Sequence, residues 1–197
     1  MGDSGSDPAL AGALPLVLAS RSPQRRAILE RLGVPFEVRP TGVRELEQGE
    51  PAVLAIENAL RKARAARLPD RAEAVVGCDT IVVLEGTVYG KPVDELQARA
   101  TLGALSGATH EVLSGLALLL PGEERTALAR TAVTFRTLDP DELDAYVASG
   151  EWRERSGGYA VQRGGAALVQ AVEGDIENVV GLPLASLIGI YPELLGR

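Results

Sequence analysis

The chain is short of the residues on which several protein classes depend. It has one cysteine, Cys78, which excludes an internal disulfide and leads us to expect a reducing, cytoplasmic location. With one histidine, His110, it also has too few ligands for an ordinary zinc site. Asp3 and Asp7 stand where a secretory signal would carry Lys or Arg, so no signal peptide is expected. Apolar runs such as residues 116–120 are far shorter than the ~20 residues of a membrane-spanning helix. We therefore expect no membrane association.

Positive charge is also scarce, and lysine most of all. Acidic residues number 27 and basic residues 20, a net charge of −7, so binding of nucleic acid by bulk electrostatics is not expected. Lys62 and Lys91 are the only lysines, against 18 arginines. Because arginine serves wherever plain positive charge is needed, these two positions could be places that require a compact ammonium. Chance is the alternative, and the count alone does not decide between them. A composition of 46% hydrophobic and 24% charged residues predicts a globular fold with a packed core.

Helical and strand-like patterns alternate along the chain without a linker between domains. Residues 1–14 are expected to be flexible and residues 15–197 to form one domain. The fold class predicted is mixed α/β (α+β), a long mixed sheet flanked by helices. Strands are predicted at 16–19, 36–39, 74–77, 111–120, 126–136 and 166–172, with a hairpin at 80–89 around Glu85-Gly86, and helices at 23–32, 51–68, 93–105, 140–148 and after Pro183.

Two stretches have the chemistry of a binding site. Ser22 is a good N-cap with Pro23 at the first helical position, so residues 20–26 offer free backbone N–H groups and arginines to an anion. A plain capped helix is the commoner interpretation of such a pattern. Asp79 is predicted where a buried strand ends and the hairpin begins, where it could hold a metal or a water, or simply form a turn. We expect Cys78 to be a small buried side chain and His110 to be structural.

The two lysines become stronger candidates for a binding site when they are considered together with the other charged residues. Lys91 follows the hairpin, and Lys62 lies on the cationic part of the long helix. With Arg25 and the carboxylates Glu45 and Asp79, they supply cations for phosphates and acids for a divalent metal. Neither a Walker-type loop nor a dinucleotide fingerprint is present, so the common nucleotide-binding motifs do not explain this set.

Seven stretches stand out in order along the chain. They are LASRSPQRR at 18–26, Glu45 with Lys62-Ala63, GCDT at 77–80, GKP at 90–92, LSGATHEV at 105–112, GYAVQ at 158–162 and VVGLPL at 179–184. Together they resemble the Maf (septum formation inhibitor) family of nucleoside triphosphate pyrophosphatases. The resemblance implies a mixed α/β fold with a cleft between two lobes, related to the inosine triphosphate pyrophosphatases. It also implies metal-dependent cleavage, with Mg²⁺ or Mn²⁺, of a nucleoside triphosphate to the monophosphate and pyrophosphate. Homodimers are implied too, although no coiled-coil or other assembly signature is present.

The resemblance also implies roles, carried over residue by residue. It makes Asp79 the proton acceptor and, with Glu45, an acidic pair for the metal. Thr80 and Gln162 resemble the branch that prefers dTTP and UTP over the one that acts on 7-methyl-GTP. Arg155 stands where the family has a phosphate-binding lysine, and Gln24 stands where it often has a first arginine. The substrate-binding set is Ser20, Ser22, Gln24, Arg25, Lys62, Thr80, Lys91, Arg155 and Gln162.

Two other functions stay open at this point. The family name suggests a regulatory binding protein in cell division, which would need a partner surface and no turnover. A purine house-cleaning pyrophosphatase acting on ITP or XTP is the other alternative. Trp152 and Tyr159 could stack on a base, but packing is the expected role of both. Pyrophosphate release from a panel of triphosphates would distinguish these functions.

Overall fold

The computed structural model describes residues 14–196, so the expected flexibility of residues 1–14 falls outside it except at Leu14. Within this range a seven-stranded sheet has the order β2-β1-β3-β5-β6-β7, with β4 paired to β3. The strands β2 and β3 run parallel to β1, and the other pairs are antiparallel, which confirms the predicted mixed sheet. The strands are β1 (Leu16–Leu18), β2 (Phe36–Val38), β3 (Ala74–Leu84), β4 (Thr87–Tyr89), β5 (Thr109–Leu120), β6 (Glu123–Phe135) and β7 (Val169–Glu173).

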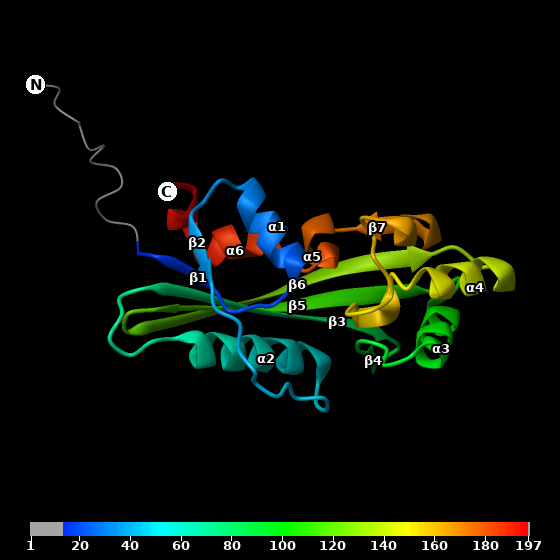
Figure 1. Cartoon of the computed structure of the whole chain (residues 1–197), viewed down its shortest axis with the longest axis horizontal. Helices are drawn as coiled ribbons and strands as arrows, with labels where there is room; N and C mark the ends of the chain where they lie inside the picture. The colour runs from blue at the N-terminus through cyan, green and yellow to red at the C-terminus, as the bar shows by residue number, and fades with distance from the viewer. Residues whose placement is uncertain (1–13, 197) are drawn as a thin grey trace, which may run out of the picture.

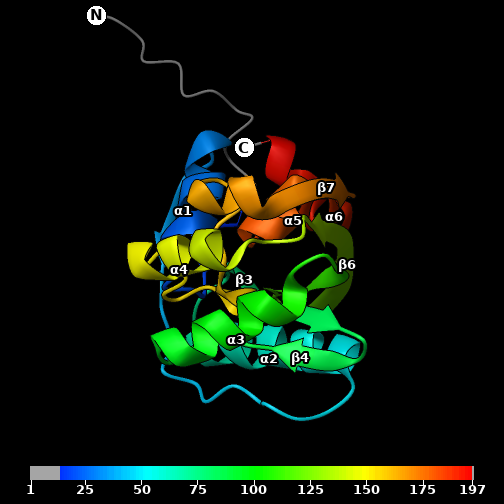
Figure 2. The ribbon, with the colours of Figure 1, turned by 90° about the vertical axis from the view of Figure 1, so that its right-hand side faces the viewer.

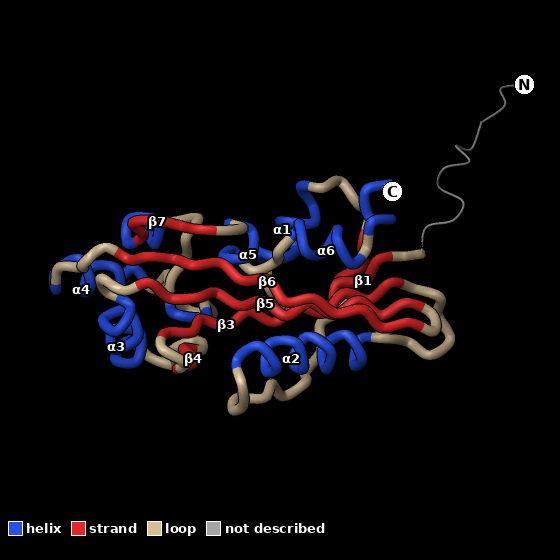
Figure 3. Tube along the Cα trace, turned by 180° about the vertical axis from the view of Figure 1, so that it is seen from behind, coloured by secondary structure: helices blue, strands red, loops and turns tan. Residues whose placement is uncertain are grey.

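Helices cover both faces of this sheet (Figures 1 and 2). Helix α2 (Pro51–Ala66) lies along one face, and α1 (Pro23–Arg31), α5 (Ile176–Val180) and α6 (Leu184–Ile190) lie on the other. Helices α3 (Glu95–Leu105) and α4 (Pro140–Ser149) gather at the far end beside β4 (Figure 3). Short 3-10 turns span Ser156–Gly158, Gly164–Leu168 and Pro192–Gly196. No helix of the described range is long and apolar enough to cross a membrane.

Side chains along β3 alternate between the two layers of core. Val76 and Cys78 pack with α1 and α6, whereas Val75 packs with α2. By the same alternation Asp79 faces α2 and Thr80 faces α1. Adjacent residues of one strand therefore present different chemistry to the two faces of the sheet.

Helix α2 packs directly against bare backbone of the sheet. A Cβ at Gly77 would lie 2.2 Å from the carbonyl oxygen of Ala59, and one at Gly115 would lie 2.2 Å from that of Ala55. Only glycine permits this approach. Gly115 is the register partner of Asp79, so the close packing brings α2 directly beside Asp79.

One edge of β3 is open at its middle. Strand β1 pairs with β3 over residues 74–76 and β4 pairs with it over residues 82–84, and no described strand covers 77–81 on that edge. The chain leaves β1 for α1 on one face and leaves β2 for α2 on the other (Figure 1). The carboxyl end of β1 is thus a topological switch point, the place where open α/β sheets bind ligands.

Most of the predicted elements are confirmed, and two are corrected. Strand β3 continues through Asp79 because β5 pairs with it from Val75 to Val83, so the prediction that Asp79 ends a strand is wrong. The predicted strand 166–172 begins only at Val169, because Gly165 packs against the backbone of Ala160 within a 3-10 turn. The sequence analysis also missed α5. The turn at Glu85-Gly86 is confirmed, and both residues have positive φ.

A buried ion pair ties β2 to the end of α2. Arg39 donates from Nη1 to Glu73 Oε1 at 2.6 Å and to the carbonyl oxygen of Ala66 at 2.8 Å, and Glu73 is 5% exposed. The hydrogen bonds from Arg39 hold the pKa of Glu73 below its ordinary value. The stability that this pair contributes is therefore complete above the unfolded carboxyl pKa of about 4.3, and is lost as pH falls through the lowered folded value.

We expect Glu73→Gln to lower the free energy of unfolding at neutral pH by ~2 kcal/mol, because the half-buried Arg39 guanidinium loses its buried carboxylate and keeps only the exposed one of Glu37. Urea unfolding of both proteins across a pH series measures this. The difference between them should narrow in acid, where the native Glu73 is protonated too. A difference of the same size at neutral and acid pH would contradict the ion-pair explanation.

Candidate active site

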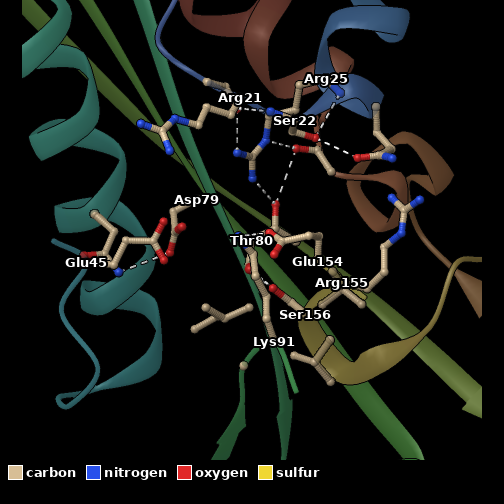
Figure 4. Close-up of a pocket in the computed structure, with 18 of the residues that line it drawn as sticks. Arg21, Ser22, Arg25, Glu45, Asp79, Thr80, Lys91, Glu154, Arg155 and Ser156 are labelled. Carbon is tan, nitrogen blue, oxygen red and sulfur yellow. Dashed lines mark hydrogen bonds and ion pairs between the residues drawn. The ribbon is translucent and has the colours of Figure 1, made fainter. Parts of the chain in front are cut away.

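A cavity of about 1210 Å³ opens at the uncovered edge of β3. Figure 4 shows Glu45 and Asp79 beside α2, Arg25 at the α1 wall, and Arg155 on a separate segment. The sequence-predicted residues therefore share one cavity, while their chemical roles stay predictions. Those lining it are Ser20, Ser22, Gln24, Arg25, Glu45, Lys62, Asp79, Thr80, Lys91, Arg155 and Gln162.

The α2 wall holds an ammonium between two carboxylates. Lys62 Nζ lies 2.6 Å from Asp79 Oδ1 and 2.6 Å from Glu45 Oε1. Lys62 comes from α2, Asp79 from β3 and Glu45 from the loop between β2 and α2. The side chain of Asp79 is 7% exposed and that of Glu45 is 43% exposed. One carboxylate is thus fixed in the wall and the other reaches it from a more open loop.

The sequence analysis missed Asn58, which completes this wall. It is buried one helical turn before Lys62, and its Nδ2 donates to Asp79 Oδ2 at 3.2 Å. Its spacing of four residues from Lys62 was the available signal, since residues at i and i+4 share a helix face. Both oxygens of Asp79 therefore accept a hydrogen bond from α2.

The opposite wall is the N-terminus of α1. Ser22 caps the helix as predicted, since its Oγ accepts from the backbone N–H of Arg25 at 3.4 Å. Three hydrogen bonds fix the Arg25 guanidinium: Nε to the carbonyl oxygen of Gly181 at 2.8 Å, Nη1 to Ser20 Oγ at 3.1 Å and Nη2 to Thr80 Oγ1 at 3.1 Å. The Ser22 hydroxyl also donates to Gln24 Oε1. This wall presents a pre-oriented cation and a helix N-terminus to the cavity.

Among the described residues, the side chains of Lys91, Arg155 and Gln162 form no hydrogen bond or ion pair with either wall, although all three line the cavity. Lys91 Nζ lies 3.7 Å from Oε2 of Glu154, an exposed residue with positive φ that the sequence analysis did not single out. Arg155 has a buried Nε without a hydrogen-bond partner among the described residues. Burial, followed by the nearby charge of Arg163, lowers the pKa of Arg155. A partly desolvated guanidinium of this kind favours a bound anion. Gln162 also lines the cavity.

Cys78 and His110 have the structural roles expected of them. Cys78 is fully buried, and burial raises the pKa of its thiol. His110 is buried with Nε2 2.9 Å from the hydroxyl of Tyr159, and burial lowers the pKa of the imidazole to about 4. Trp152 is buried and donates to a backbone carbonyl, so it packs as expected. Tyr159 packs too, and it also lines the cavity.

The donor set suits a hard divalent cation. Glu45 and Asp79 each direct one oxygen to Lys62 Nζ, and their other lone pairs beside it are what a metal could use. Mg²⁺ is commonly held by one or two carboxylates together with substrate phosphates and water. Across residues 14–196 no group of three or more His, Cys, Asp or Glu side chains gathers as a metal site. The remaining ligands would therefore come from substrate and water.

Comparison with known proteins finds a matching family model, several relatives and a solved structure. The family model described as "Maf-like protein" matches residues 15–193, which confirms the resemblance seen in the motifs. A dTTP/UTP pyrophosphatase of Moorella thermoacetica is 47% identical over 176 residues, covering 87% of this chain and 91% of its own. Those of Anaeromyxobacter sp. and Deinococcus radiodurans are 48% and 43% identical, covering 88% of this chain and 86% and 89% of their own. Among solved structures, the Staphylococcus aureus Ham1 protein aligns with a TM-score of 0.46 and 15% identity, covering 61% of this chain and 71% of its own.

Proposed function

This chain belongs to the Maf family, and from that membership we infer that it is a nucleoside triphosphate pyrophosphatase acting on dTTP and UTP. In this reaction the oxygen of a water molecule bonds to the α-phosphorus. The bond from that phosphorus to the α,β-bridging oxygen breaks, which yields the monophosphate and pyrophosphate. The observation that carries the proposal is the presence of two carboxylates and several cations from separate segments in one cavity.

Phosphate binding is assigned to the cations of the cavity walls. Arg25 is held in place by three hydrogen bonds, so it meets a phosphate without first losing side-chain freedom. Arg155 and Lys91 approach from the other side and neutralise charge that builds up on the leaving pyrophosphate. A triphosphate bound between these walls would have its reacting phosphorus near β3.

We assign to Asp79 the role of accepting a proton from the attacking water. Each carboxylate oxygen has two lone pairs, and Lys62 and Asn58 occupy one on each oxygen. A lone pair therefore stays available to accept a hydrogen bond from water and then its proton as the new P–O bond forms. Glu45 and Asp79 would hold Mg²⁺ or Mn²⁺, which when bound neutralises phosphate charge and acidifies coordinated water.

Base recognition is assigned first to Gln162. Its amide carries both a donor and an acceptor, which matches the edge of thymine or uracil. The hydroxyl of Thr80 already accepts from Arg25 and lies 2.8 Å from Ser114 Oγ, so Thr80 supports the Arg25 wall as well as any base contact. Gln24 holds the Ser22 hydroxyl beside the same wall.

Pyrophosphate release from dTTP, UTP, ITP, XTP and 7-methyl-GTP, with and without Mg²⁺, tests the function. We expect turnover of dTTP and UTP that is highest with the metal. A preference for ITP or XTP would establish the purine house-cleaning alternative. No turnover of any triphosphate, together with an effect on cell division that persists in Asp79→Asn, would establish the regulatory alternative.

Lys91→Ala tests whether the cations of the cavity bind the triphosphate, at the most exposed of them. We expect kcat/KM for dTTP to fall about 10-fold, because the triphosphate loses one counter-charge. The fold should be unaffected, since the Lys91 side chain is half exposed and its ion pair is with the exposed carboxylate of Glu154 at 3.7 Å. Steady-state kinetics measures the effect, with Arg99→Ala, an exposed cation outside the cavity, as the control. Unchanged kinetics would remove Lys91 from the site.

Several sequence-based expectations stay predictions. They are the homodimer, the cytoplasmic location, the absence of nucleic acid and membrane partners, and the division of residues 15–197 into two lobes around the cleft.

A further inference from the structure

Asn58 joins two parts of the cavity wall that are distant in sequence. Its side chain is 2% exposed, on the face of α2 that packs on the sheet. Its Oδ1 accepts from the backbone N–H of Leu46 at 2.7 Å, and its Nδ2 donates to the carbonyl oxygen of Leu46 at 3.0 Å. The amide thus satisfies both backbone groups of one residue, as a neighbouring strand would. Because Leu46 directly follows Glu45, this contact fixes the loop that carries Glu45.

The same amide nitrogen also reaches Asp79. Nδ2 lies 3.2 Å from Asp79 Oδ2. The orientation of the amide follows from its partners, since only the oxygen can accept the Leu46 N–H, and this leaves Nδ2 facing the carboxylate. Both hydrogens of Nδ2 and the acceptor Oδ1 are therefore used within the protein. Although Asn58 lines the cavity, these contacts leave it little capacity for substrate.

We propose that Asn58 is a positioning residue that holds the carboxylates of Glu45 and Asp79 in a fixed relation on either side of Lys62. The inference rests on the proposed function, because it assigns importance to those two carboxylates. Lys62 contacts both of them, but its ammonium is a point charge on a flexible stem and sets no direction. The planar amide of Asn58 makes three hydrogen bonds in fixed directions, so it does set the orientation of its partners.

Asn58→Ala and Asn58→Asp test the proposal by steady-state kinetics with dTTP. We expect kcat to fall about 10-fold or more in both while KM changes less than about 3-fold, because small misplacements of reacting groups lower turnover more than binding. The aspartate keeps the size of the side chain and an acceptor for the Leu46 N–H, but it places an oxygen opposite Asp79. If the alanine variant does not fold, the kinetics of Asn58→Asp alone test the proposal.

Asn178→Ala is the matched control. Asn178 is fully buried and donates through Nδ2 to the carbonyl oxygen of Val112 and to Thr131 Oγ1, both at 3.0 Å, and it does not line the cavity. We expect this variant to lose stability comparably but to keep a kcat near that of the native protein. An equal fall of kcat in the Asn58 and Asn178 variants would show a general loss of stability and overturn the proposal.

Two further readouts separate a positioning role from a structural one. Hydrogen exchange of a peptide covering residues 41–50 should be faster in Asn58→Ala, because the Leu46 N–H loses its acceptor, and unchanged in Asn178→Ala. This measurement does not depend on turnover. Combining Asn58→Ala with Asp79→Asn should lower kcat by less than the product of the two separate falls, because Asn58 acts in part through Asp79.

The outcomes distinguish this inference from the proposed function. Native kcat in both Asn58 variants, with Asp79→Asn inactive, overturns the role of Asn58 and leaves the proposed function standing. Full activity in Asp79→Asn overturns the proposed role of Asp79 and the inference that depends on it. Unchanged exchange at residues 41–50 in Asn58→Ala overturns the claim that Asn58 fixes this loop.

Discussion

Asp79→Asn is expected to lower kcat for dTTP by about 100-fold or more, because an amide cannot take the proton of the attacking water. The substituted side chain keeps the size of the carboxyl group, and its oxygen can still accept from Lys62, which in the native protein lies 2.6 Å from Oδ1. We therefore expect the variant to fold and to retain nucleotide binding. Pyrophosphate release measures kcat, and titration with dTTP under conditions without turnover measures binding.

The structure offers a matched control for this substitution. Glu124 pairs with Arg64, another cation of α2, at 2.7 Å, but this pair is exposed and outside the cavity. Glu124→Gln removes a carboxylate of β6 that pairs with the same helix, without touching the site, so kcat should stay at the native value. A folded Asp79→Asn variant with native turnover would exclude Asp79 as the proton acceptor.

Lys62→Met is expected to lower kcat/KM for dTTP by about 100-fold. The substitution removes one positive charge from the cavity wall that faces the triphosphate, and it leaves Glu45 and Asp79 without the ammonium that they share. It should also lower the free energy of unfolding by ~3 kcal/mol, because the buried Asp79 loses its counter-charge. Steady-state kinetics and urea unfolding measure the two effects separately.

Two further variants separate charge from geometry at position 62. Lys62→Arg keeps the charge but replaces a compact ammonium with a planar fork, so we expect stability to recover more than activity. Arg64→Met removes a cation two residues away on the exposed side of α2 and should change neither quantity appreciably. If Lys62→Met kept native kcat/KM, the ammonium between the two carboxylates would have no part in turnover.

Local rules predicted the local structure well. The cap at Ser22 and the proline at position 23 gave the start of α1, because both effects depend on the first turn alone. The turn at Glu85-Gly86 was predicted for the same reason. The end of a strand at Asp79 was predicted wrongly, because β3 is extended by its pairing with β5, which lies more than thirty residues further along the chain.

The candidate site was predictable as a set of residues but not as a geometry. Motif order brought Arg25, Lys62 and Asp79 into one hypothesis, yet it gave no reason for Arg25 to bond to Thr80, 55 positions away. Asn58 was missed because its partners, 12 and 21 positions away, become neighbours only when α2 lies on the sheet. A buried polar side chain is recognisable only when its partners are known.

The glycines under α2 have a consequence for protein engineering. At positions 77 and 115 the helix rests on peptide planes, which have no alternative rotamers, so repacking of nearby side chains cannot compensate for an added methyl group. Libraries intended to change nucleotide preference should keep both glycines and concentrate diversity around Gln162, which faces the cavity from a separate segment. Variants selected for new substrates would then differ around Gln162 and keep the distances that join Lys62 to Glu45 and Asp79.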